Sequence, residues 1–120
     1  MNKKIITQNG VNIAVIDSSE AIITDVNTAL DLIGTVYYSD GCDCMCVNKE
    51  AVCEDFFKLS TGIAGEILQK FVNYSMKLAI IGDFSEYNSK PLKDFIYECN
   101  NGGHIFFVKD TAQALEKLAV

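Results

Sequence analysis

The side chains that could support acid–base catalysis are few and lie far apart in the sequence. His104 is the only histidine, and it follows Gly102-Gly103 at the predicted start of a strand. Asp83, the carboxylate that would complete a catalytic triad, follows the predicted end of another strand. Strand starts and strand ends lie at opposite edges of a parallel sheet, so a nucleophile, this imidazole and this carboxylate would not meet. We therefore expect no catalytic residues.

Five cysteines form a second group of reactive side chains, and three of them alternate along a predicted strand at residues 42–48. Because side chains alternate across a strand, Cys42, Cys44 and Cys46 are predicted to share one face. Neighbouring members would be about 6.5–7 Å apart, a spacing that does not suit a tetrahedral metal site. We expect reduced, buried thiols and no metal or cofactor. A metal site is the alternative if this segment is a loop.

A pair of hydroxyls at the start of the predicted central helix is the main candidate functional site. Ser60, Thr61 and Gly62 precede an amphipathic segment whose apolar residues recur at helical spacing. Either hydroxyl would cap the helix by accepting a hydrogen bond from a free backbone N–H group. Gly62 and Gly65 have no side chains, so the first turn would lie close against the sheet, or would admit an anion or a partner backbone.

A second candidate site lies where predicted parallel strands end. Asn48 and Lys49 follow one such strand, and Asp83 and Ser85 follow the next. Ligands of open α/β sheets gather at the carboxyl ends of the strands, so these four side chains mark a possible ligand edge. Asp83 is otherwise expected to be a solvated loop or cap residue. A small-molecule-binding protein or an enzyme using this edge is the alternative to a non-enzymatic role.

The elements that would position these residues alternate along the chain. Asn9-Gly10 separates two apolar segments, which is a strong signal for a β-hairpin. A continuous apolar run at Leu78–Ile81 predicts a strand covered on both faces, as in a parallel sheet flanked by helices. The five predicted strands cover residues 4–8, 11–16, 42–48, 78–81 and 105–108.

Four amphipathic helices are predicted between and after these strands. The first starts at Ser19 or Thr24 and ends at Gly34, and residues 36–41 then form a loop. A helical turn at residues 54–58 precedes the central helix. Pro91 marks the first turn of the third helix, and Asp110 caps the last. The order predicts a single α/β domain over residues 1–120, with a mixed sheet of about five strands and an N-terminal hairpin.

Composition narrows the class of protein. The net charge is −6 and the chain contains no arginine, so we expect no nucleic-acid partner. No apolar run has the length needed to span a membrane, which takes about 20 residues. The first ten residues have too short an apolar run for a signal peptide, so a cytoplasmic location is expected.

Several segments resemble a bacterial family known only as a domain of unknown function, DUF4180. Residues 61–71 and 77–85 carry the longest part of the resemblance, and residues 89–98 extend it. With Asn9-Gly10 and residues 114–118, the similarity covers nearly the whole chain. The family implies no established activity.

The order of the elements is also similar to that of the STAS domain, the fold of anti-sigma factor antagonists. In that fold a Ser-Ser or Ser-Thr pair followed by Gly starts the helix after strand three, and a partner kinase phosphorylates one hydroxyl. Ser60-Thr61-Gly62-Ile63 stands in a similar place, with Thr61 at the modified position. Leu59 replaces the acidic residue that typically precedes the pair. The resemblance implies a non-enzymatic regulatory domain that binds another protein. A structural homodimer in which hydrophobic helix faces pair is a separate possibility.

Overall fold

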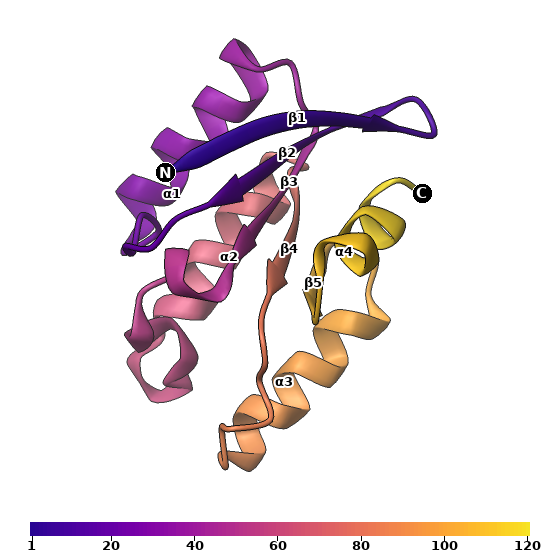
Figure 1. Ribbon diagram of the computed structural model, residues 1–120. Coiled ribbons are helices and arrows are strands. Elements are labelled where there is room, and N and C mark those ends of the chain that lie inside the picture. Colours follow the sequence, from indigo (N-terminus) through magenta and orange to yellow (C-terminus); the bar gives the residue numbers. More distant parts are fainter.

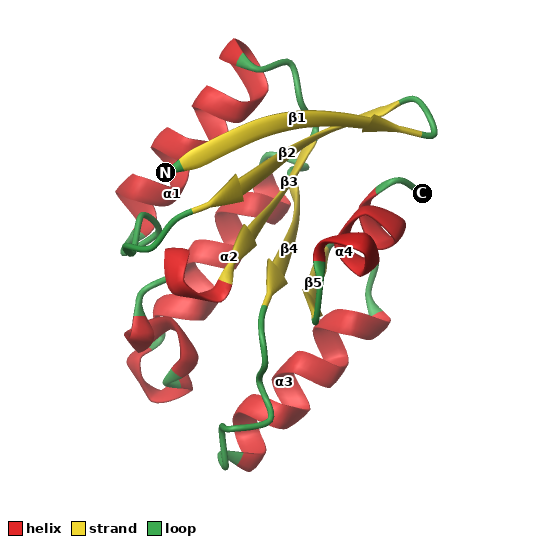
Figure 2. Cartoon of the chain, viewed as in Figure 1, coloured by secondary structure: helices red, strands yellow, loops and turns green.

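A five-stranded mixed sheet with helices on both faces forms the structure, a computed structural model that describes residues 1–120 (Figures 1 and 2). The strands lie side by side in chain order. The pair β1–β2 is antiparallel, and the pairs β2–β3, β3–β4 and β4–β5 are parallel. The predicted α/β class and N-terminal hairpin are confirmed. The strands are β1 (Asn2–Gln8), β2 (Val11–Asp17), β3 (Cys44–Asn48), β4 (Lys77–Ile81) and β5 (Ile105–Val108).

The hairpin between β1 and β2 turns at the expected dipeptide. Asn9 has φ 54° and Gly10 has φ 78°, so both residues occupy the left-handed region that a tight two-residue turn requires. Gln8 pairs with Val11 directly across the turn. This local chemistry fixes the register of the antiparallel pair.

Four α-helices cover the sheet unequally. Each crossover moves the chain one strand further in the same direction, and right-handed crossovers then place α1, α2 and α3 on one face. The last helix, α4, lies alone on the opposite face (Figure 1). None of the helices is both long and apolar enough to span a lipid bilayer. The helices are α1 (Val26–Gly34), α2 (Ile63–Asn73), α3 (Lys90–Asn101) and α4 (Thr111–Leu118).

Two hydrophobic layers result from this arrangement. Leu78 and Ile80 of β4 point into the larger layer, beneath the three helices on one side. Ala79 points into the smaller layer, beneath α4. The prediction that this apolar strand is covered on both faces is confirmed, since all three residues are at most 1 % exposed.

The first helix differs from its prediction at both ends. It begins after Asp25, whose side chain accepts a hydrogen bond from the Thr28 N–H group in a capping box, so a start at Ser19 or Thr24 was wrong. The predicted loop at residues 36–41 was also wrong, because a π-helix, η1 (Thr35–Ser39), continues the helix. The extra turn buries Val36 completely in the larger layer, which explains why the chain stays helical.

The three alternating cysteines do not share one face, contrary to the prediction. Strand β3 starts at Cys44, so only Cys44 and Cys46 point toward α4. Cys42 lies before the strand and packs in the larger layer. Gly41 has φ 68°, and the Cys42 N–H group donates to the Val36 carbonyl at 3.0 Å, so the backbone turns here before it becomes extended.

Candidate functional site

The Thr61 hydroxyl closes the turn that leads into α2. A short 3₁₀ turn, η4 (Leu59–Thr61), directly precedes the helix. Thr61 Oγ1 lies 2.8 Å from the carbonyl oxygen of Lys58 and 2.9 Å from that of Asp55, to which it donates, and it accepts from the Ile63 N–H group at 3.2 Å. One of the two predicted hydroxyls therefore serves a free helix N–H group. The exposed Ser60 side chain makes no hydrogen bond within the chain.

Gly62 occupies the N-cap position of α2 in a left-handed conformation, with φ 77°. A side chain at this position would meet no atom within 4 Å, so the backbone conformation and not crowding requires glycine. The cap therefore lies one residue after the hydroxyl pair. No side chain caps the helix from the N-cap position itself.

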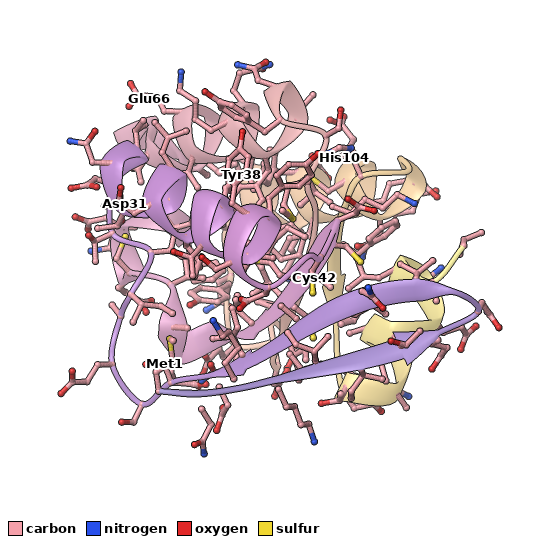
Figure 3. All side chains as sticks on the ribbon, turned by 90° about the horizontal axis from the view of Figure 1, so that it is seen from above. Met1, Asp31, Tyr38, Cys42, Glu66 and His104 are labelled. Carbon is pink, nitrogen blue, oxygen red and sulfur yellow. The ribbon has the colours of Figure 1, made fainter.

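Gly65 faces solvent on the first turn of α2. A β-carbon at Gly65 would have no neighbouring atom within 4 Å, so the expected close contact between this glycine and the sheet was wrong. The helix instead buries Ala64, Ile67 and Phe71, which lie on another side of it. Glu66, the next residue, projects outward from α2 (Figure 3). We define the helix-start surface as the exposed residues Ser60, Thr61, Gly62, Gly65 and Glu66.

Asn48, at the end of β3, is fully engaged with the chain beside it. Its Oδ1 accepts from the Ser18 N–H group at 2.9 Å, and its Nδ2 donates to the Ser18 carbonyl at 2.7 Å. The Asn48 side chain thus fastens the residue that follows β2 to the end of β3. Since Ser18 is buried, these two bonds satisfy backbone groups that water does not reach.

Lys49 is also held within the chain. Its ammonium group pairs with Glu86 and lies 4.7 Å from the centre of the Tyr87 ring. The Tyr87 ring stacks on Phe57 with 5.3 Å between centroids, and its hydroxyl donates to Glu54 Oε1 at 3.1 Å. Burial, together with the nearby Glu54 carboxylate, raises the pKa of Tyr87 to about 12. These contacts pack the segment after β4 onto the segment before α2.

Asp83 and Ser85 bond to each other. Asp83 Oδ1 accepts from Ser85 Oγ at 2.6 Å and from the Ser85 N–H group at 3.0 Å. These hydrogen bonds hold the pKa of the exposed Asp83 carboxyl below its usual value. The four ligand-edge side chains are therefore each engaged with a different local partner: Ser18 for Asn48, Glu86 for Lys49, and each other for Asp83 and Ser85.

The strand order leaves no crevice of the kind that binds ligands in doubly wound sheets. Such a crevice forms where the strand order reverses, and here the parallel strands follow one another without reversal. A cavity of about 510 Å³ nevertheless lies at the C-terminal ends of β2, β3 and β4, beside the start of α4. We call it the β1–α4 cavity, and it is lined by Asn2, Lys3, Lys4, Val15, Ile16, Asp17, Asn48, Ile81 and Thr111.

Sequence reasoning missed the two lysines of this cavity. Lys3 forms an ion pair with Asp40, with 2.7 Å between Nζ and Oδ2, whereas Lys4 has no ion-pair partner. Both residues belong to β1, the hairpin strand. The Asn9-Gly10 turn is the signal that could have found them, because its register pairs Lys3 with Ile16 and Lys4 with Val15, near the end of β2.

His104 lies at the opposite edge of the sheet from Asp83, as predicted. Its Nε2 lies 3.1 Å from the Phe71 carbonyl oxygen, to which it donates, and its own carbonyl accepts from the Leu78 N–H group near the start of β4. Asp83 follows the end of the same strand. The imidazole and this carboxylate are thus separated by the length of β4. Figure 3 shows His104 beside the helices that cover the larger layer.

The buried thiols are poor nucleophiles. Burial raises the pKa of Cys44 and of Cys46 to about 11, so both are protonated at neutral pH. Cys99 behaves in the same way, again with a pKa of about 11 because of burial. No three His, Cys, Asp or Glu side chains lie close enough together to form a metal-binding group.

A family model described as "Domain of unknown function (DUF4180)" matches residues 8–118, which confirms the resemblance noted in the sequence. Searches of the curated proteins and of the solved structures find no match.

Proposed function

We propose that this chain, which belongs to the DUF4180 family, is a non-enzymatic, STAS-like regulatory domain that binds another protein through the helix-start surface. Gly65 is the observation that carries the proposal. Glycine inside a helix costs about 1 kcal/mol relative to alanine, and no contact within the chain requires it here. Its absent side chain leaves room beside Thr61 for a partner backbone to approach the helix.

The order of the elements supports the STAS-like part of the proposal. A hairpin is followed by helices and parallel strands in alternation, and the hydroxyl pair precedes the helix after the third strand. Ser60-Thr61-Gly62 thus has the chain position that the resemblance assigns to the phosphorylated segment. A bacterial, cytoplasmic regulator is the setting that we propose for it.

A phosphate on Thr61 would act as a switch in this proposal. It would add about two negative charges and remove the proton that the hydroxyl donates to backbone carbonyl oxygens. The phosphate oxygens would be repelled by those carbonyls and attracted by the free N–H groups of α2. The turn before α2 would rearrange, and an acidic partner would be repelled.

A capture experiment with matched variants tests the proposal. Thr61→Glu adds a charge at the start of α2, and Asn27→Glu adds the same charge at the exposed start of α1 as the control. We expect a partner retained by the wild type and by Asn27→Glu, and lost from Thr61→Glu. Identical partner sets for all three proteins, or no partner, would contradict the proposal.

Gly65→Lys separates loss of the surface from loss of the fold. Lysine is a better helix former than glycine, so this variant stays folded and gains stability. We expect it to bind the captured partner at least tenfold more weakly, measured by calorimetry with the purified proteins. Light scattering on the wild type distinguishes a separate partner from a second copy of the chain.

The β1–α4 cavity supports a second candidate function, a small-molecule-binding protein at the C-terminal edge of the sheet. Its volume of about 510 Å³ falls in the range of ligand sites, and Lys4, which has no ion-pair partner, supplies a positive charge. We expect inorganic phosphate or succinate to shift the amide NMR signals of Lys4 and Thr111. Unchanged signals, or equal shifts in Lys4→Gln, would remove this candidate.

A further inference from the structure

A second cavity, of about 770 Å³, lies at the other end of the molecule. It is formed where η1, the continuation of α1, meets the C-terminal end of α2, and Figure 3 places Tyr38 between these two helices. We call it the tyrosine cavity. It is lined by Leu30, Ile33, Gly34, Tyr37, Tyr38, Asp43, Tyr74 and Ser75.

Three exposed aromatic rings dominate this cavity. The exposed fractions are 50 % for Tyr37, 85 % for Tyr38 and 61 % for Tyr74. The Tyr37 and Tyr38 rings are nearly perpendicular, at 88° with 4.9 Å between centroids, so they present surfaces in two directions. These large rings leave apolar surface in contact with water that folding could have buried. A cluster of such exposed rings is typical of a binding surface.

The π-helix creates this arrangement. The Asp40 N–H group donates to the Thr35 carbonyl at 3.1 Å, which closes a turn one residue wider than an α-helical turn. Single π-helical turns cost hydrogen-bond geometry and occur frequently at functional sites.

The electrostatics of the cavity favour a positive ligand. Asp43 is its only charged lining residue, and no lysine or histidine lines it. Asp43 is exposed and has no ion-pair partner. The C-terminal ends of η1 and α2 also meet here, and helix C-termini carry partial negative charge. Tyrosine faces add further attraction for a cation.

We propose that the tyrosine cavity binds a small organic cation of the quaternary ammonium class. Quaternary ammonium groups are weakly hydrated and need no hydrogen-bond acceptors, so ring faces hold them well. A metal ion would require several oxygen ligands, whereas Asp43 is the one carboxylate present. The volume accommodates such a cation together with an attached apolar group.

This inference is independent of the proposed function. The helix-start surface lies at the N-terminal end of α2, and Tyr74 follows its C-terminal end. The eleven-residue helix separates the two sites by about 16 Å. Failure of partner binding at Thr61 would therefore leave the cation site untouched, and the converse also holds.

A titration with choline and with its neutral carbon isostere, 3,3-dimethylbutan-1-ol, tests the inference. The two molecules share shape and hydroxyl, and only choline carries the charge. We expect choline to shift the ring NMR signals of Tyr37, Tyr38 and Tyr74 in a saturable manner. The neutral isostere should bind at least fivefold more weakly, in keeping with a cation–π contact.

Three variants and a control assign the response to this cavity. Tyr38→Ala should weaken choline binding about fivefold or more, while Tyr38→Phe, which keeps the ring face, should stay within about twofold. Asp43→Asn should weaken binding severalfold and reduce its salt dependence. Tyr97→Ala, which removes a 70 % exposed tyrosine on α3, should have no effect.

Three outcomes would overturn the inference. They are equal affinity for choline and its isostere, no saturable response to choline, and equal losses in Tyr38→Ala and Tyr97→Ala. Amide NMR spectra of each variant confirm that it is folded, and the high exposure of Tyr38 and Tyr97 makes unfolding by either substitution unexpected.

Discussion

The Lys49 side chain lies directly against Gly82, so that a β-carbon on Gly82 would come within 2.8 Å of Lys49 Cβ and 3.1 Å of Lys49 Cδ. This contact joins the residue after β3 to the residue after β4. It depends on the absence of a side chain at Gly82, because the Lys49 β-carbon is fixed by its own backbone.

Gly82→Ala should therefore destabilise the fold by overpacking, by about 1–3 kcal/mol. The free energy of unfolding in urea measures this loss. Gly103→Ala is the matched control, because a β-carbon there meets no atom within 4 Å and the backbone needs no positive φ. Equal stability of the two variants would show that Lys49 can move away from the added β-carbon without loss of stability.

The two glycines at the start of α2 should respond in opposite directions to alanine. Gly65→Ala should stabilise the protein by about 0.5–1 kcal/mol, since it improves helix propensity at an open position. Gly62→Ala should destabilise it by about 1–2 kcal/mol, because φ 77° is unfavourable for a residue with a β-carbon. Thermal unfolding of both variants gives the comparison, and a loss in Gly65→Ala would reveal an unrecognised contact.

The two hydroxyls before α2 should contribute unequally to stability. Thr61→Val removes a hydroxyl that donates to a backbone carbonyl oxygen and accepts from Ile63, and should cost about 1 kcal/mol. Ser60→Ala removes an exposed side chain without a bonded partner and should change stability by less than about 0.5 kcal/mol. Urea unfolding midpoints distinguish them, and a larger effect at Ser60 would refute this assignment.

Asn48→Ala should destabilise the protein by about 1–3 kcal/mol, because it leaves the buried Ser18 backbone groups without partners. Asn73→Ala, which removes an exposed hydrogen bond with Gln69, is the control and should be nearly neutral. Amide hydrogen exchange at Ser18 should accelerate in the first variant. Unchanged exchange there would mean that water replaces the Asn48 side chain.

Because the pKa values of the buried thiols are raised, we expect the protein to lose stability at alkaline pH. Cys44 and Cys46 have a pKa of about 11 in the folded chain against 9.0 for an unperturbed thiol, so the folded state binds more protons between these values. Their contribution is complete below about pH 9 and is lost as the pH rises toward 11. Urea midpoints from pH 7 to 11 measure the decline, which should be shallower in a Cys44→Ala/Cys46→Ala variant. An unchanged slope would assign the decline to other groups.

Local sequence was enough to predict most of the individual elements. Asn9-Gly10 defines the hairpin because both turn positions tolerate positive φ. Pro91 lies in the first turn of α3, and Asp110 caps α4 by accepting from the Gln113 N–H group, as the pattern predicted. Each of these features depends on residues a few positions apart, which is why the sequence displays them.

The helix-start surface was predicted in part. The sequence identified Ser60, Thr61 and Gly62 as the approach to α2, but it left open which hydroxyl serves the helix and what lies beside Gly65. Both answers depend on which side of α2 packs against the sheet. The spacing of apolar residues in the sequence does not define that side to within one residue. Gly65 is exposed because Ala64 and Ile67 occupy the buried side of α2 in the tertiary structure.

The sequence by itself determined most of the segments that become strands and helices, because backbone preferences and apolar periodicity act over one or two turns. The π-helix η1 is the exception, since the sequence predicted a loop there. Tertiary structure alone decided how distant segments meet. It placed Cys42 in a different layer from Cys44, and it set Tyr74 beside Tyr37 and Tyr38 across more than thirty residues of chain. The physical reason is that the order of the strands and the hand of the crossovers decide which distant residues become neighbours. These features bury the most apolar surface for the whole chain, and no local pattern in the sequence indicates them.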